Sequence, residues 1–289
     1  MTMTRSARTD KVDELHQRLT AQVEALISSD DWRAMLDIAA RLHRYSARNL
    51  LLILAQRPQG VTRLAGYRGW QSFGRQVRKG EQGIAILAPC VYRKRPVDDT
   101  EGGDPPELGR ILRGFRVAYV WDESQTDGPP LADVRPQLLV GDDPAQLWTG
   151  IAAQLAAEGY AVSRGDCGGA NGSTDFVART VMVRDDVDDL QAVKTLTHER
   201  AHALIHDPSQ GPIARDRAEV EAESVAYIVC QRAGLATTDY SIPYVARWSG
   251  SDLAIVASTA DRVVGAARRI LDDLGLGEPE SDAVATDSA

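Results

Sequence analysis

Cysteine is scarce in this sequence, and long apolar runs are absent from it. Its three cysteines, Cys90, Cys167 and Cys230, lie far apart among 289 residues. An odd number of widely spaced cysteines provides neither a disulfide framework nor a CxxC metal clip, so we expect reduced thiols. No window of about 18 apolar residues occurs, and the N-terminus carries charges where a signal peptide has its apolar core. These absences predict a cytoplasmic protein with no membrane partner.

Negative charge predominates overall but is unevenly distributed. The formal net charge is −8, yet residues 31–95 carry +10 and residues 96–289 carry −17. A basic segment of this density suits a polyanion, because lysine and arginine side chains that neutralise phosphates release condensed counterions. The alternative interpretation is a basic face that is simply solvated by water. A basic first module followed by an acidic second module is expected in either case.

Hydrophobic periodicity divides the chain into helical and extended segments. Spacings of three and four predict helices over residues 10–28, 32–55, 145–159, 190–206, 218–232 and 251–274. Short apolar runs predict strands over residues 84–94, 114–121 and 180–184. Acidic segments rich in glycine and proline predict a solvated loop over residues 97–109 and a break between modules over residues 127–144.

Chain length and these segments together predict two domains of the α+β class. At roughly 150 residues per domain, 289 residues are enough for two. We place the first, basic domain at residues 1–140 and the second domain at residues 141–277. The small and acidic residues 278–289 predict a disordered tail.

The sharpest motif is a histidine pair in the helix predicted over residues 190–206. His198 and His202 lie four residues apart, so they share one helix face and can present two imidazoles to one tetrahedral Zn²⁺. Glu199 lies about 100° around the helix from His198, where it can act on a metal-bound water as general base. The strand predicted over residues 180–184 offers an edge with which an extended peptide can pair. The HExxH pattern on a helix therefore predicts a zinc metallopeptidase site.

A catalytic zinc needs a third protein ligand, and the helix predicted over residues 218–232 offers acidic candidates. Glu219 and Glu223 share one face of this helix, whereas Glu221 lies about 200° away from Glu219. Glu219 is the predicted metal ligand. Glu223, one turn later, is the predicted hydrogen-bond acceptor that orients His198.

Two further polar residues near these motifs are predicted to lie outside the site. Glu221 stands four residues after Arg217, a spacing that predicts an ion pair on the helix surface. His206 continues the histidine stripe but lies one turn too far to bind the same ion, so a surface or substrate-facing position is expected.

Two stretches of the second half resemble the ImmA/IrrE-type metallopeptidases and the C-terminal domain of ArdC-type antirestriction proteins. They are KTLTHERAHALIH at residues 194–206 and EVEAESVAYIVCQ at residues 219–231. The first half is similar to the N-terminal domain of the ArdC family in YSxxN at residues 45–49, GYxxW at 66–70 and GRxVxKGE at 74–81. This order of motifs implies an ArdC-like single-stranded-DNA-binding domain followed by a zincin-like metallopeptidase domain. Arg200 departs from the family pattern, which has an apolar residue at that position.

The first domain also contains the residue types that hold single strands. Single-stranded DNA is bound by a positive groove for its phosphates and by aromatic faces for its unstacked bases. Basic residues beside Gly74 and Gly80 are favoured, because glycine lets the backbone approach a phosphate. Tryptophan in such a segment is more often a core residue, but Trp70 is retained among the candidates. The predicted contacts are Arg44, Tyr45, Arg48, Asn49, Tyr67, Arg68, Trp70, Arg75, Arg78 and Lys79.

These observations lead to one functional hypothesis and two alternatives. The main hypothesis is a single-stranded-DNA-binding protein with zinc-dependent peptide hydrolysis that acts in antirestriction or in protecting the DNA of a mobile element. Its expected partners are single-stranded DNA and a protein substrate or restriction enzyme. One alternative is a sensor metalloprotease that cleaves a transcriptional repressor. The other is a non-catalytic DNA-binding protein in which zinc is only structural.

Overall fold

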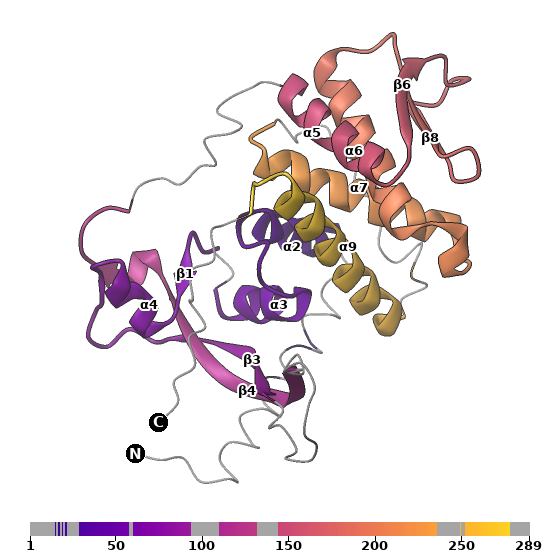
Figure 1. The fold of residues 1–289 in the computed structure, drawn as a ribbon. Helices are drawn as coiled ribbons and strands as arrows, with labels where there is room; N and C mark the ends of the chain where they lie inside the picture. Colours follow the sequence, from indigo (N-terminus) through magenta and orange to yellow (C-terminus); the bar gives the residue numbers. More distant parts are fainter. Residues whose placement is uncertain are drawn as a thin grey trace, which may run out of the picture.

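The computed structural model of the chain shows a mixed α+β protein (Figure 1). It describes residues 29–57, 60–93, 110–131, 144–235 and 252–277, together with residues 15, 17, 19, 21 and 249. The loop predicted over 97–109, the tail predicted over 278–289 and most of the helix predicted over 10–28 lie outside these residues. No helix in the described ranges combines the length and the apolar character needed to cross a membrane.

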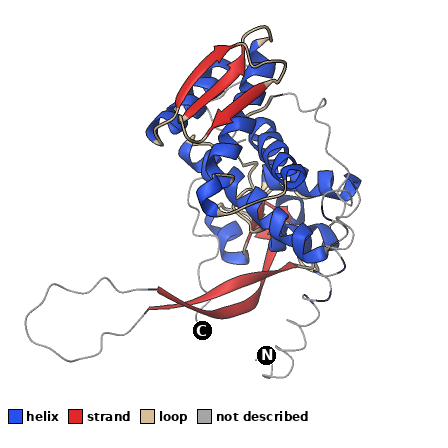
Figure 2. Cartoon of the chain, turned by 90° about the vertical axis from the view of Figure 1, so that its right-hand side faces the viewer, coloured by secondary structure: helices blue, strands red, loops and turns tan. Residues whose placement is uncertain are grey.

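In the ranges from residue 29 to 131 that the structure describes, the first half has helices α2 and α3, a long hairpin and a group of short elements at the base of the hairpin. Helices α2 (Ser29–Arg41) and α3 (Ala47–Gln56) precede the hairpin of β3 (Ile84–Arg93) and β4 (Arg110–Asp122), which Figure 2 shows as a twisted ribbon. The short elements are β1 (Leu64–Ala65), α4 (Tyr67–Ser72), β2 (Gln76–Val77), the 3-10 turn η1 (Glu123–Gln125) and β5 (Thr126–Asp127). Since β1 pairs with β4 and β2 pairs with β5, α4 is tied to the end of β4.

Side-chain amides of α3 cover the edge of β3 that does not pair with β4. Asn49 donates from Nδ2 to the Leu87 carbonyl at 3.0 Å, and its Oδ1 accepts from the Leu87 amide at 2.9 Å. Gln56 makes the same pair of bonds with Ala85, both at 2.9 Å. These bonds satisfy an exposed strand edge that would otherwise be open to another chain. Asn49 is therefore corrected from a predicted DNA contact to a residue that holds α3 on the hairpin.

Within the described residues 144–235 and 252–277, the second half has four long helices and a small sheet. The helices are α5 (Pro144–Ala157), α6 (Asp189–Ile205), α7 (Arg215–Arg232) and α9 (Leu253–Asp273), with the 3-10 turn η3 (Pro208–Gln210) between α6 and α7. They confirm the four helices that the periodicity predicts in this half. The strands are β6 (Ala161–Gly165), β7 (Gly172–Asp175) and β8 (Thr180–Arg184).

The small sheet has the strand order β6-β8-β7. β8 pairs in parallel with β6 and antiparallel with β7, so it is the central strand. The prediction that residues 180–184 form an edge is therefore wrong. The alternation of Val181 and Val183 indicated a strand, but alternation does not show on how many sides a strand is paired. The strand that lies at the edge beside α6 is β7.

Both halves of the chain contribute to one hydrophobic core. α2 packs against α7, and α3 contacts α9, as Figure 1 shows from the position of the two N-terminal helices beside α9. Trp32 of α2 is fully buried and donates from Nε1 to the Ser224 hydroxyl on α7 at 3.1 Å. The predicted domain boundary between residues 140 and 141 stays a prediction. In the structure, α2 and α3 of the first half pack against helices of the second half.

Candidate functional site

The histidine motif lies on α6, a helix that begins at a well-formed cap. Asp188 precedes the helix and accepts a hydrogen bond from the Gln191 amide at 2.8 Å, which satisfies one of the free N–H groups of the first turn. The buried face of α6 carries Val193 and Leu196 into the shared core. The histidine pair follows one turn later, at the border between this core and a cavity.

Three potential metal ligands come together from α6 and α7. His198 Nε2 lies 3.0 Å from His202 Nε2 and 3.4 Å from Glu219 Oε2, and His202 Nε2 lies 3.8 Å from the same oxygen. A tetrahedral ion with bonds of about 2.0 Å keeps its ligand atoms roughly 3.3 Å apart. Two imidazole nitrogens and one carboxylate oxygen with these separations fit a divalent metal ion.

Glu223 holds the other ring nitrogen of His198. The two partners, His198 Nδ1 and Glu223 Oε2, are 3.2 Å apart, which leaves Nε2 of the ring to face the other two ligands. Burial by itself lowers the pKa of His198, but hydrogen bonds to Glu219 and Glu223 outweigh burial and raise this pKa to about 9. Hydrogen bonds from His198 and His202 hold the pKa of Glu219 well below its ordinary value. The protonation of His198 and that of Glu219 are therefore linked, because each group stabilises the charged form of the other.

The third histidine of the stripe is buried and connects His202 to Glu221. His206 Nδ1 lies 2.9 Å from His202 Nδ1, and His206 Nε2 lies 3.0 Å from Glu221 Oε2. Glu221 is 0% exposed and also accepts from Arg217 and Arg262, at 2.8 and 2.7 Å. The predicted pair with Arg217 is confirmed, whereas the surface positions predicted for Glu221 and His206 are wrong. α7 packs against α2, α6 and α9, so a residue that points away from the cavity still meets a neighbouring helix.

Glu199 is buried beneath β7, next to the histidine pair. Its Oε2 accepts a 2.6 Å hydrogen bond from the Thr174 hydroxyl on β7. β7 crosses so close to α6 that a Cβ added at Gly172 would lie 2.7 Å from Glu199 Oε1. Only glycine permits this approach without displacement of the carboxylate. Sequence reasoning missed Thr174 and Gly172, because nothing in their spacing indicates which strand covers α6.

A cavity of about 640 Å³ opens over this group of residues. Its walls include His198, His202, Glu199 and Glu219 on the helices, and residues 170–174 on the opposite side. The edge strand β7 thus forms part of the wall. An extended peptide can add to such an edge by backbone hydrogen bonds and lie across the three potential ligands.

Arg200, the residue that departs from the family pattern, lies on the other side of α6. Its side chain is 0% exposed and makes two parallel bonds to Glu158, at 2.8 and 3.0 Å. A third bond joins Nε to Gln154 Oε1 at 3.1 Å. Gln154 belongs to α5, and Glu158 directly follows this helix. On the side of α6 away from the cavity, an ion pair and a hydrogen bond therefore join α6 to α5.

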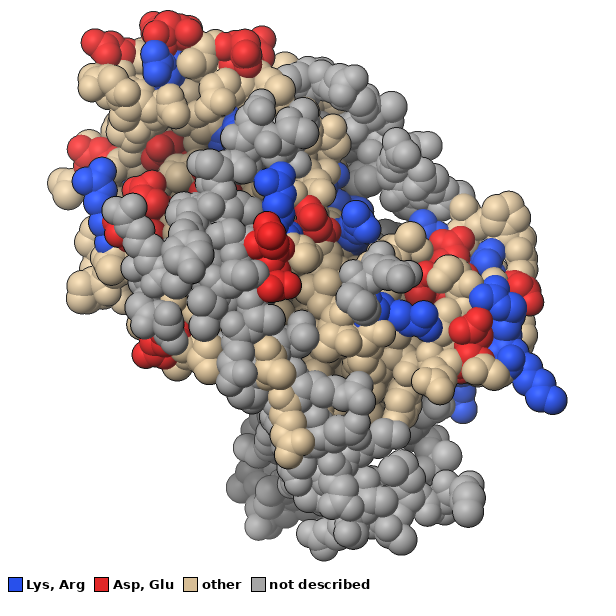
Figure 3. All heavy atoms as spheres, turned by 180° about the vertical axis from the view of Figure 1, so that it is seen from behind, with Lys and Arg blue, Asp and Glu red and all other residues tan. Residues whose placement is uncertain are grey.

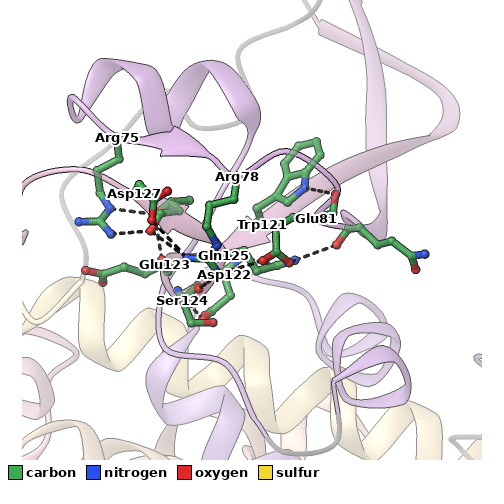
Figure 4. A network of polar contacts seen from close by, with 11 residues as sticks. Arg75, Arg78, Glu81, Trp121, Asp122, Glu123, Ser124, Gln125 and Asp127 are labelled. Atoms are coloured by element: carbon green, nitrogen blue, oxygen red, sulfur yellow. Dashed lines mark hydrogen bonds and ion pairs between the residues drawn. The ribbon is translucent and has the colours of Figure 1, made fainter.

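Two predicted DNA contacts of the first half are structural residues. Trp70 is 0% exposed and donates from Nε1 to the Trp121 carbonyl at 2.9 Å. Arg75, labelled in Figure 4, is buried, and its guanidinium donates to Thr126 Oγ1 at 2.8 Å. It also donates to the Gly128 carbonyl at 3.3 Å. A guanidinium held in this way cannot reach a phosphate. Trp70 and Arg75 are therefore corrected from DNA contacts to parts of the fold.

The other candidates differ in how far they are available to a ligand. Arg78 donates to Glu81 at 2.8 Å and to the Ser124 carbonyl at 2.5 Å, so most of its charge is compensated (Figure 4). Lys79 is exposed and forms no ion pair within the described part of the chain. Arg48, Tyr67 and Arg68 are also exposed, whereas Arg44 and Tyr45 are half-buried. In Figure 3, basic and acidic side chains are mixed at the right of the view, the end of the molecule that carries α4.

The fold and the site first define a class of protein: an α+β chain with a His, His, Glu group on two packed helices and a basic N-terminal half. Residues 6–121 match a known family, described as the N-terminal domain of anti-restriction factor ArdC. This match agrees with the resemblance of the first-half motifs to the ArdC N-terminal domain.

Two further comparisons cover most of the chain. An uncharacterized protein of Bacillus anthracis is 24% identical over 301 residues, which cover 88% of this chain and 51% of that protein. The chain thus spans about half the length of this curated relative. The metal-free crystal structure of the antirestriction protein ArdC from plasmid R388 covers 81% of this chain and 85% of its own, with 18% identity and a TM-score of 0.51. The two proteins share their fold. The Mn(II)-bound structure of the same plasmid protein gives a TM-score of 0.48.

Proposed function

We propose that this chain is an antirestriction protein in which a DNA-binding first half is joined to a zinc-dependent, zincin-like peptidase site. The observation that carries the proposal is the convergence of His198, His202 and Glu219 beside the buried carboxylate of Glu199. The match of residues 6–121 to the ArdC N-terminal domain supports the antirestriction part. His198, His202 and Glu219 are the proposed ligands.

The cavity favours a catalytic site over a structural zinc site. Structural zinc sites are closed by four protein ligands, whereas catalytic sites use three and keep a position open. Within the described residues the donor group has three members, and it faces a cavity of about 640 Å³. Two imidazoles and one carboxylate are also a common ligand set for catalytic zinc.

The proposed chemistry assigns one task to each protein group. His198, His202 and Glu219 would hold a zinc ion, which when bound would supply Lewis-acid activation of the scissile carbonyl and of a water. Glu199 takes the proton from this water as general base, with Thr174 holding the carboxylate in position. β7 holds the substrate backbone in an extended form across the site. The substrate is thereby oriented before proton transfer begins.

Glu199→Gln separates metal binding from catalysis. We expect this variant to bind zinc like the wild type but to hydrolyse casein roughly 10²- to 10⁴-fold more slowly, because it loses the general base and keeps the ligands. Zinc content and casein cleavage measured on the same preparations test this. Asp216→Asn, an exposed carboxylate on α7, serves as the control and should change neither quantity.

The same variants test the antirestriction activity in cells. Transfer of unmodified DNA into a restricting host should be protected by the wild type and not by Glu199→Gln. If Glu199→Gln and His198→Ala both protect the DNA fully, hydrolysis is not part of the function, and the non-catalytic DNA-binding alternative replaces our proposal. Protection lost in His198→Ala alone indicates a structural metal.

We also propose that His206 and Glu221 position the His202 ligand. If His202 binds metal through Nε2, its Nδ1 carries the proton and donates to His206 Nδ1. His206 Nε2 then carries a proton and donates to Glu221. The chain of bonds sets the tautomer and ring orientation of His202.

His206→Leu should weaken zinc binding about 10- to 100-fold, whereas His206→Asn should restore most of it. The reason is that the asparagine oxygen can accept the bond from His202 Nδ1 and leucine cannot. Competition titration with a chelator measures the affinity, and the absorption spectrum of the Co²⁺-substituted protein reports ligand geometry. Equal affinities for the two variants would show that His206 only fills space.

A further inference from the structure

A second cavity, of about 560 Å³, lies at the base of the hairpin and outside the metal centre. Two aromatic rings form part of its wall, Tyr67 from α4 and Trp121 from the end of β4. Their ring centroids are 6.1 Å apart and their planes are at 74°, so they form a corner. Tyr67 is 42% exposed, in contrast to the fully buried Trp32 and Trp70 of the same half.

Both rings are held in place before any ligand arrives. The Trp121 indole donates to the Glu81 carbonyl at 3.5 Å and lies against Gly83, where an added Cβ would be 2.9 Å from a ring atom. The Tyr67 hydroxyl accepts a hydrogen bond from the Gln76 amide. A preformed aromatic corner loses little conformational entropy when a flat ligand binds.

The charges around this corner leave one lysine available. Arg78 is engaged by Glu81 and Asp127, at 2.8 and 3.4 Å. Lys79 also lines the cavity, is exposed and forms no ion pair with any residue that the structure describes. Aromatic faces beside Lys79, whose charge is unpaired among the described residues, match the two parts of a nucleotide, which are a flat base and a phosphate.

We infer that this corner, the Tyr67/Trp121 pocket, receives one unstacked base of a single-stranded nucleic acid, with Lys79 at the neighbouring phosphate. The inference rests on the proposed DNA-binding function of the first half and assigns it a site. A duplex keeps its bases stacked inside, so it cannot place one in this corner without flipping it out. The pocket therefore selects single strands over duplex.

Binding of a fluorescently labelled single-stranded oligonucleotide of mixed sequence to the full chain tests the assignment. Trp121→Leu and Tyr67→Leu should each weaken binding roughly 5- to 100-fold, the loss expected for one stacked base. Phe115→Leu is the matched control, because Phe115 lies on the same strand, is 52% exposed and does not line the pocket. It should bind like the wild type. Lys79→Ala should lower the salt slope of binding by about one, and Trp121→Leu should leave that slope unchanged.

Two conservative variants separate stacking from a loss of structure. Trp121→Phe keeps an aromatic face and should restore affinity to within about threefold, but the quenching of tryptophan fluorescence by bound DNA should disappear. Gly83→Ala should displace the indole and weaken binding, although it removes no ring and no charge. If the wild type binds no single strands, the proposed DNA-binding function fails. If it binds them and Trp121→Leu and Tyr67→Leu bind equally well, only the pocket assignment is wrong.

Discussion

Alanine at His198, His202 or Glu219, the proposed ligands, is expected to lower zinc affinity by more than about 100-fold in each single variant. The wild type should hold about one ion per chain, because two imidazoles and one carboxylate form a complete three-ligand site. Metal analysis after dialysis and a competition titration with a chelator measure both quantities. The loss should exceed the effect of any single hydrogen-bond partner, since a ligand contributes a bond to the ion itself.

Heat denaturation provides a second measure of the same site. Zinc at about 100 times its Kd stabilises the folded state by about 2.7 kcal/mol, which raises the Tm by roughly 5 to 10 °C for a chain of this size. The three ligand variants should lose this gain, and Asp216→Asn should keep it. If Glu219→Ala retains full metal while Glu223→Ala or Glu221→Ala loses it, the assignment of the third ligand is wrong.

Loss of the Glu158 carboxylate should destabilise the fold strongly, because it leaves the buried Arg200 without a counter-charge. Breaking one side of a buried ion pair costs about 3 to 5 kcal/mol, so Glu158→Ala should lower the Tm by about 10 °C. Thermal and urea unfolding of the metal-free protein measure this effect without a contribution from zinc.

The double variant Arg200→Leu with Glu158→Leu should recover much of the stability, because no charge then remains buried. Arg269→Ala is the control. Arg269 also contacts Glu158 at 3.0 Å, but it is 59% exposed, and the change should be within about 1 kcal/mol. A single variant Glu158→Ala as stable as the wild type would show that Arg200 finds another partner or reaches water.

The grouping of the two histidines on one face of α6 was predictable because a helix repeats every 3.6 residues. The spacing of His198 and His202 alone places their rings on one face, and the structure has their Nε2 atoms 3.0 Å apart. The same rule selected Glu219 and Glu223 together on α7. It treated Glu221 as a surface residue, however, because periodicity describes the faces of one helix and not the neighbours that pack on each face.

The prediction of DNA contacts was wrong at residue types that serve equally well in binding DNA and in the interior of the fold. Arg75 and Trp70 have the chemistry of a DNA contact, and the neighbouring Gly74 supported that interpretation for Arg75. In the structure the Arg75 guanidinium donates hydrogen bonds to Thr126 and Gly128, and the Trp70 side chain is buried in the core. A buried guanidinium must find acceptors in the chain, and those acceptors come from a strand about 50 residues away that no local pattern connects to it.

By itself, the sequence determined the helices of the second half, the HExxH face of α6 and the resemblance of the first half to the ArdC N-terminal domain, because each of these depends on short-range spacing. Only the tertiary structure decided that β7 is the strand over Glu199, that His206 and Glu221 stand behind His202, and that Tyr67 meets Trp121. These contacts join residues from elements that are distant in the chain. Their geometry follows from how whole helices and strands pack, which depends on the burial of many side chains at once.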